Sequence, residues 1–105
     1  MHLPTLLTAA LAAAPLASAF KFTIYHQIHF TGGSRSWTSP GTYTIGSGGG
    51  KSWKFETLPR DRCCVRLCYQ GREVGYRCQP DSNPNSSPID KVVLGCGNIV
   101  LRCQA

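Results

Sequence analysis

Six cysteines in a chain of 105 residues constrain the possible fold more than any other feature of the sequence. All six lie in the second half of the chain, at Cys63, Cys64, Cys68, Cys78, Cys96 and Cys103. A domain this small buries only about 60% of the surface that its unfolded chain exposes, so it depends on cross-links for stability. Because the spacing lacks the paired Cys-x-x-Cys knuckles of a zinc site, we predict three disulfides and no metal. The sequence alone leaves fifteen pairings open.

The first 19 residues predict export from the cell. Residues 1–19 contain no Asp, Glu, Lys or Arg, and they end in the small-x-small pattern Ala17-Ser18-Ala19. This combination is typical of a secretory signal peptide, which is too short and too rich in alanine for a stable membrane span. The mature chain, residues 20–105, is then a single cysteine-rich domain that is secreted to the extracellular space, where disulfides persist.

The mature chain carries the pattern of an all-β protein. Its first segment has apolar residues at every second position, beginning with Phe22 and Ile24, and no later window shows a helical period of 3.6 residues. Short segments of this kind alternate with turns that contain glycine or proline, which favours an all-β sandwich or barrel. The expected strands are Lys21–Phe30, Ser36–Trp37, Thr42–Ile45, Lys51–Glu56, Cys63–Tyr69, Val74–Cys78, Val92–Leu94 and Asn98–Cys103. The polar segment Gln79–Pro88 is expected to be a surface loop.

One disulfide can be suggested from a hairpin. If the turn spans Gln70–Glu73, Val65 lies opposite Cys78, and Cys63 and Cys78 become diagonal neighbours on one face. This favours a Cys63–Cys78 bond. The remaining partners stay open, with Cys64 and Cys68 pairing with Cys96 and Cys103 in either order. We further expect Gly95–Cys103 to add a terminal strand at a sheet edge.

The segment from Phe22 to Ser34 resembles the opening of a βγ-crystallin Greek-key motif. Tyr25, Phe30 and Gly32 occupy the positions of its two aromatics and its glycine. The resemblance implies a β-sandwich of two Greek-key halves, which the predicted disulfides would staple. The loop Ser82–Ser87 is similar to the family's calcium loop, but Pro84 interrupts it and it offers few oxygen ligands, so we expect no metal or cofactor.

The whole chain also resembles, as a class, the small secreted cysteine-rich proteins of fungi. In plant-colonising fungi this class includes effectors, among them the biotrophy-associated secreted proteins, and similar β-folds occur in killer toxins and antifungal proteins. The resemblance implies a non-enzymatic virulence factor that acts by binding in the extracellular space around a host. The alternatives are a cationic antimicrobial or killer-type toxin and, third, a small secreted RNase or hydrolase.

The hydrolase hypothesis needs an acid and a base around a phosphate, with a cation nearby. His26 or His29 could serve together with Glu56 and Arg60. No further feature supports this arrangement, and we therefore predict no enzymatic activity. The simpler expectation is that one histidine faces solvent while the other packs beneath the glycine-rich loop at residues 48–50. The aromatic residues Trp37, Trp53, Tyr43 and Tyr76 are more typical of a core than of a sugar-binding platform.

The net charge is +6, from eleven Lys and Arg against five Asp and Glu. On a strand Arg62 and Arg66 share a face, and the predicted hairpin places Arg77 opposite Arg66, which suggests a basic binding patch. We expect a monomer that binds an unknown host protein, an acidic polysaccharide or a membrane surface. No recognition motif for nucleic acid accompanies the charge. The sequence Asn85-Ser86-Ser87 is an acceptor for N-glycosylation, which makes Asn85 the expected site of a glycoprotein modification.

Overall fold

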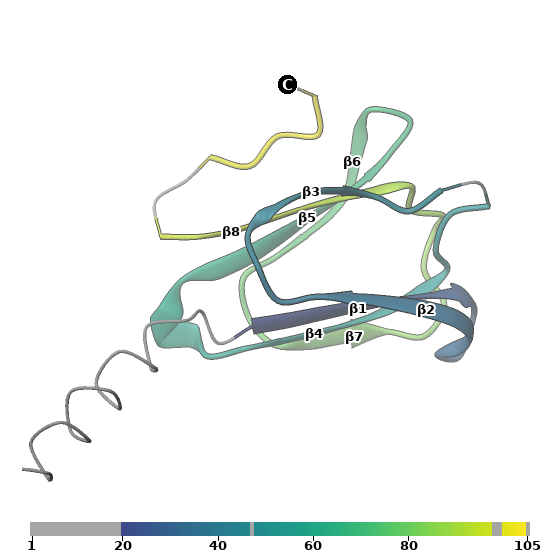
Figure 1. Cartoon of the computed structure of the whole chain (residues 1–105), viewed down its shortest axis with the longest axis horizontal. Helices are drawn as coiled ribbons and strands as arrows, with labels where there is room; N and C mark the ends of the chain where they lie inside the picture. The colour runs from purple at the N-terminus through teal and green to yellow at the C-terminus, as the bar shows by residue number, and fades with distance from the viewer. Residues whose placement is uncertain (1–19, 47, 98–99, 105) are drawn as a thin grey trace, which may run out of the picture.

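The computed structural model describes residues 20–46, 48–97 and 100–104, and the predicted signal peptide lies outside these residues. The prediction of an all-β protein is confirmed: in the described part of the chain the regular elements are strands and a 3-10 helix, η2 (Pro59–Asp61) (Figure 1). The strands are β1 (Phe20–Gln27), β2 (Thr31–Trp37), β3 (Gly41–Thr44), β4 (Ser52–Thr57), β5 (Cys63–Tyr69), β6 (Arg72–Arg77), β7 (Asp81–Asn83) and β8 (Lys91–Cys96). No helix among the described residues has the length and apolar character needed to cross a membrane.

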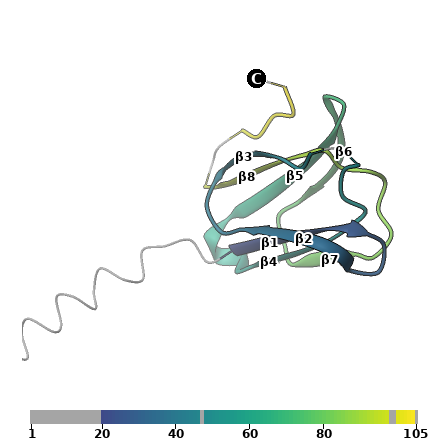
Figure 2. The ribbon, with the colours of Figure 1, turned by 45° about the vertical axis from the view of Figure 1, so that its right-hand side comes forward.

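Two antiparallel sheets face one another (Figure 2). Sheet A has the order β2-β1-β4-β7, and sheet B has the order β3-β8-β5-β6. The chain thus falls into two halves with the same connectivity. Each half gives its first, second and fourth strands to one sheet and its third strand, β3 or β7, to the opposite sheet. Each sheet therefore has one edge strand that comes from the other half of the chain.

The hydrophobic core fills the space between the sheets. The period-two pattern of β1 turns Phe22 and Ile24 inward, where they meet Trp53 of β4. Val65 of β5 and Leu94 of β8 lie opposite each other in sheet B, and each is at most 2% exposed. Burying one such side chain contributes about 1.5–3 kcal/mol. The core therefore depends on both halves of the chain.

All six cysteines form disulfides within the domain. Cys63 bonds to Cys96, which lies directly opposite it on β8, and Cys63 is 1% exposed in the main core. Cys64 bonds to Cys78 just beyond the end of β6. Cys68 bonds to Cys103 in the C-terminal tail. Each bond thus joins β5 to a different part of the second half.

The predicted Cys63–Cys78 bond is wrong, because the register of the β5–β6 hairpin differs by one residue from the prediction. The turn is the two-residue loop Gln70–Gly71, whose φ values of 52° and 80° give the type of turn that suits a hairpin. Val74 is an extra residue on β6 that forms a β-bulge. A shift of one residue exchanges the two faces of a strand, so Cys78 meets Cys64 in place of Cys63.

The additional terminal strand expected over Gly95–Cys103 does not form: Gly95 and Cys96 end β8, and the C-terminal tail, residues 100–103, is not a strand. This tail instead crosses the outer face of sheet B, where Leu101 and Cys103 pack against Cys68 and Val93. The amino group of Lys91 donates a hydrogen bond to the carbonyl oxygen of Cys103 at 2.7 Å. The reason is topological: β8 already has β3 and β5 as neighbours, so it offers no free edge, while its outer face offers an apolar cluster.

A strand lies where a loop was expected. The segment Gln79–Pro88 contains β7, which pairs Asp81 with Phe55 and Asn83 with Trp53 of β4. β7 is a short edge strand with exposed polar residues, so its sequence lacks the apolar alternation that identifies a strand.

We expect a tryptic digest of the non-reduced protein, analysed by mass spectrometry, to identify the Cys68–Cys103 bond, while Cys63 and Cys64 share one peptide and need the double variants to be told apart. The peptide Leu67–Arg72 should be joined to Cys103–Ala105, while Cys63–Arg66 should be joined to both Cys78–Lys91 and Val92–Arg102.

The double variant C64A/C78A should fold with two bonds and lose about 3 kcal/mol of stability, as its 14-residue loop predicts. The matched variant C63A/C78A should misfold or scramble. Folding of C63A/C78A with two clean bonds would contradict the assigned pairing.

Candidate interaction surface

The residues of the aromatic–glycine motif come together where β1 ends. The rings of Tyr25 and Phe30 make an edge-to-face contact, with centroids 5.7 Å apart. Phe30 has a φ of 58° and Gly32 a φ of 79°, and a Cβ at Gly32 would lie 2.8 Å from Cγ of Gln27. A side chain at position 32 would therefore be strained by the backbone conformation and by its contact with Gln27, which favours glycine where the chain folds back.

Ser52 holds this folded hairpin, a role that no sequence pattern indicates. Its side chain is fully buried at the start of β4. The hydroxyl donates a hydrogen bond to the carbonyl oxygen of Gln27 at 2.6 Å and accepts one from the backbone N–H of Phe30 at 3.0 Å. Serine is usually an exposed residue, and the local pattern gives no signal that this one is buried. We call this end of the sandwich, residues 25–32 with Ser52, the hairpin end.

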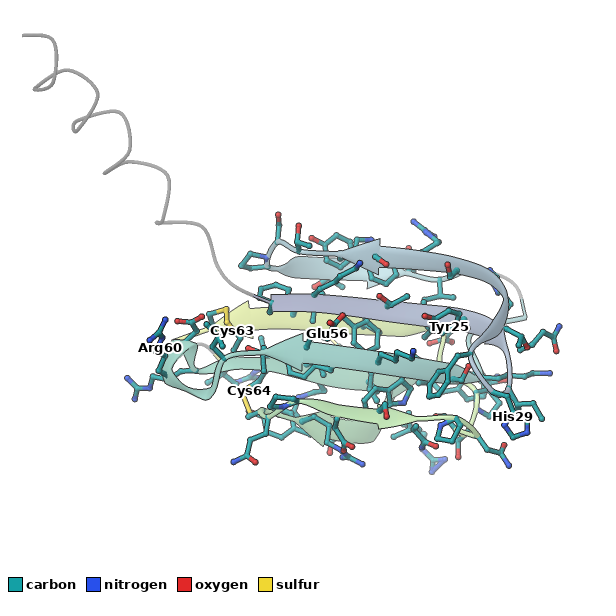
Figure 3. The ribbon with its side chains drawn as sticks, turned by 90° about the horizontal axis from the view of Figure 1, so that it is seen from below. Tyr25, His29, Glu56, Arg60, Cys63 and Cys64 are labelled. Carbon is teal, nitrogen blue, oxygen red and sulfur yellow. A yellow bond between two sulfur atoms is a disulfide. The ribbon has the colours of Figure 1, made fainter. Side chains whose placement is uncertain are left out.

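The two histidines behave as the simpler expectation states. His26 is half-buried, and its Nδ1 lies 3.1 Å from the carbonyl oxygen of Gly49 in the glycine-rich loop. His29 is exposed, and its backbone N–H donates to the carbonyl oxygen of Pro84. Figure 3 shows His29 and Arg60 at opposite ends of the domain. The structure therefore does not bring His29, one of the two histidines of the hydrolase hypothesis, together with Arg60.

The predicted arginine patch is divided between two faces. Arg66 lies opposite Tyr76 on the outer face of sheet B, with its guanidinium 4.3 Å from the ring centroid and in an ion pair with Glu73. Arg77 lies opposite Val65, a core residue, and so belongs to the inner face. The predicted pairing of Arg66 with Arg77 is wrong for the same reason as the predicted disulfide. Both predictions assume the same register of the β5–β6 hairpin, and the bulge at Val74 shifts the actual register by one residue.

Arg77 closes one side of the sandwich, where β6 of sheet B approaches β7 of sheet A. Its Nε donates to Oδ2 of Asp81 at 2.8 Å, and its guanidinium lies 5.7 Å from the ring centroid of Trp53. The hydrogen bond from Arg77, helped by one from the backbone N–H of Ser82, lowers the pKa of Asp81 below its ordinary value. The charge of Arg77 is therefore compensated locally.

The opposite side of the sandwich is closed in a similar way. The guanidinium of Arg35 on β2 lies 5.2 Å from the ring centroid of Trp37, and Trp37 stacks on Tyr43 of β3 at 4.9 Å. Trp53 is 1% exposed, and Tyr76 lies against Arg66. Trp53, Trp37 and Tyr43 thus belong to the core or pack against it, as expected, whereas the expectation is wrong for Tyr76, which is exposed on the outer face of sheet B.

Arg60 and Arg62 are exposed at the end of the domain where β4 passes into β5. Arg60 and Arg62 both lie in or beside the 3-10 helix η2, and the carbonyl oxygen of Arg62 accepts a hydrogen bond from Gly97 at 3.0 Å. Nearby, the connection between β6 and β7 lines a shallow pocket of about 390 Å³. We call this region, residues Arg60–Arg62 and Tyr76–Asp81, the arginine end.

In and beside the loop that resembles a calcium loop, two side-chain oxygen atoms accept hydrogen bonds from the local backbone. Oδ1 of Asp81 accepts from the backbone N–H of Ser82, and Oδ1 of Asn83 accepts from that of Asn85. Among the residues that the structure describes, no three His, Cys, Asp or Glu side chains gather as a metal site would require. Asn85 itself is exposed.

Comparison with protein-family models, with curated proteins and with solved structures finds no match for this chain. Any functional assignment therefore depends on the geometry and charge of the chain itself.

The variant S52A should lower the free energy of unfolding by about 1–3 kcal/mol, because it leaves two partly buried hydrogen-bonding groups, the carbonyl of Gln27 and the N–H of Phe30, without their partner. Urea unfolding followed by tryptophan fluorescence measures the loss. The matched variant S34A, on the exposed strand β2, should change stability by less than about 0.5 kcal/mol. Equal losses for the two variants would show that Ser52 does not hold the hairpin.

The Arg77–Asp81 ion pair should contribute stability that depends on pH. Because the pKa of Asp81 is lower in the folded than in the unfolded state, this contribution is present at neutral pH and is lost as the pH falls from about 4 through the lowered pKa. The difference in unfolding free energy between wild type and D81N should therefore shrink across that range, and the variant E56Q provides the control. A difference that stays constant down to pH 2 would argue against the ion pair as its source.

Proposed function

We propose that this chain is a secreted, non-enzymatic effector of a host-colonising fungus, and that its arginine end binds an acidic partner in the extracellular space. The observation that carries this proposal is the position of two exposed arginines on a segment that disulfides fix directly behind them. Arg62 is followed at once by Cys63 and Cys64, which bond to Cys96 and Cys78.

Rigid attachment favours binding. A surface that is already ordered loses little conformational entropy on association, so more of its interaction energy appears as affinity. Arginine presents a planar fork of donors that suits carboxylates, and it remains charged at any physiological pH. The adjoining pocket of about 390 Å³ is a hollow in this surface into which a side chain of a specific partner could insert.

The net charge of +6 supports an acidic partner, either a host protein or an acidic wall polysaccharide. Such a charge raises the rate of encounter with a negative surface, and salt weakens the attraction. Of the five acidic residues, Glu73 pairs with Arg66 and Asp81 pairs with Arg77, while Asp61 lies between Arg60 and Arg62 in the chain.

We also propose that the domain is a Greek-key sandwich of the βγ-crystallin type. Three observations support this: the exchange of third strands between two halves, the contact of Tyr25 with Phe30, and the positive φ of Gly32. Ser52 adds a fourth, because it fixes the folded hairpin from the fourth strand of the same half.

A cationic antimicrobial or killer-type toxin is the second candidate. The same positive charge favours it, since anionic membranes and walls attract a basic protein. It differs from the first candidate in its readout: it inhibits the growth of competing microbes, and inhibition fades as salt is added.

The test is an allele exchange in the producing organism. The variant R60E/R62E should reduce host colonisation to the level of a gene deletion, because charge reversal at the arginine end repels an acidic partner. The variant K51E/R72E makes the same change in net charge on exposed residues at the other end of β4 and β6, and it should colonise like wild type. Secreted protein levels and disulfide content should be equal for all strains.

Two results would overturn the effector proposal. The first is normal colonisation by R60E/R62E at a normal secreted level, which would remove the arginine end from the mechanism. The second is equal transcript abundance in the host and in axenic culture together with salt-sensitive killing of competing microbes, which would favour the toxin.

A further inference from the structure

The segment between β7 and β8 carries a modification site. Asn85-Ser86-Ser87 is an acceptor sequence for N-glycosylation, and elsewhere in the chain Asn83 and Asn98 are not followed by the required Ser or Thr. Both Asn85 and Ser87 are exposed. The acceptor therefore lies where an oligosaccharide can extend into solvent without displacing the core.

The backbone around Asn85 is fixed by contacts that a glycan would not disturb. The N–H of Asn85 donates to Oδ1 of Asn83 at 3.0 Å, which turns the chain outward at this position. The N–H of Ser86 donates to the carbonyl oxygen of Lys51 at 2.8 Å. On the far side, Ile89 is fully buried and exchanges backbone hydrogen bonds with Gly50.

These contacts place Asn85 at the hairpin end. Pro84 accepts the backbone hydrogen bond of His29, and Lys51 directly precedes β4, whose other end leads to Arg60. Figure 3 shows His29 and Arg60 far apart along the length of the strands. A group attached at Asn85 therefore covers the hairpin end and leaves the arginine end open.

We propose that Asn85 carries an N-linked glycan, which shields the hairpin end and restricts the binding surface of the secreted protein to its arginine end. The glycan is attached in the secretory pathway, so this inference rests on the proposed export of the chain. It adds to that proposal by assigning different roles to the two ends of one small domain.

The experiment expresses the full chain, with its own residues 1–19, in a yeast secretory host and measures intact mass before and after treatment with peptide-N-glycosidase F. The wild-type protein in the medium should carry an oligosaccharide that the enzyme removes, converting the side chain of Asn85 to a carboxylate. N85Q and S87A should each lose the modification completely. S86A, which alters the middle position only, and S87T, which keeps a hydroxyl, should retain it.

The outcomes separate this inference from the proposed function. A secreted wild-type protein of unmodified mass would overturn the glycan and leave export intact. Failure of the wild-type chain to reach the medium would contradict export and the glycan together. Retention of the oligosaccharide in N85Q would place it on another residue and would also overturn the assignment. Because S87A preserves Asn85 and its hydrogen bond, it tests the site even if N85Q folds poorly.

Discussion

Strand β5 is the part of the molecule on which the rest depends. It lies between β6 and β8, and it supplies one cysteine to each of the three disulfides. Because successive side chains of a strand point to opposite faces, Cys63 can reach into the core while Cys64 reaches outward. Cys68 then holds the C-terminal tail against the outer face of sheet B. Removing β5 would release the hairpin partner, the fourth strand of the second half and the tail at once.

Much of this architecture could be predicted from local pattern. The alternation of Phe22 and Ile24 identified β1, and the bounds predicted for Cys63–Tyr69 match β5. The aromatic–glycine motif brought Tyr25 and Phe30 into contact, as the spacing indicated. These features are local, and they depend on residues within one strand or one turn.

The errors arose where a long-range feature decides the outcome. The bulge at Val74 moves β6 by one residue, which changes the partner of Cys78 and separates Arg66 from Arg77. No composition rule identifies such a bulge before the pairing is known. The tail was assigned to a sheet edge because the sequence does not show that β8 lies inside its sheet. The role of Ser52 also requires knowledge of which loops meet.

The exchange of the third strands has a consequence for the origin of this domain and for attempts to divide it. Each half lacks one strand of its own sheet and completes the sheet of the other half. A single half, expressed or inherited alone, would leave an open edge beside its fourth strand and an unaccommodated third strand. A single half could cover its open edge and place its third strand in a sheet only by pairing with a second copy of itself. The two-half chain is thus the smallest unit that closes both sheets within one molecule.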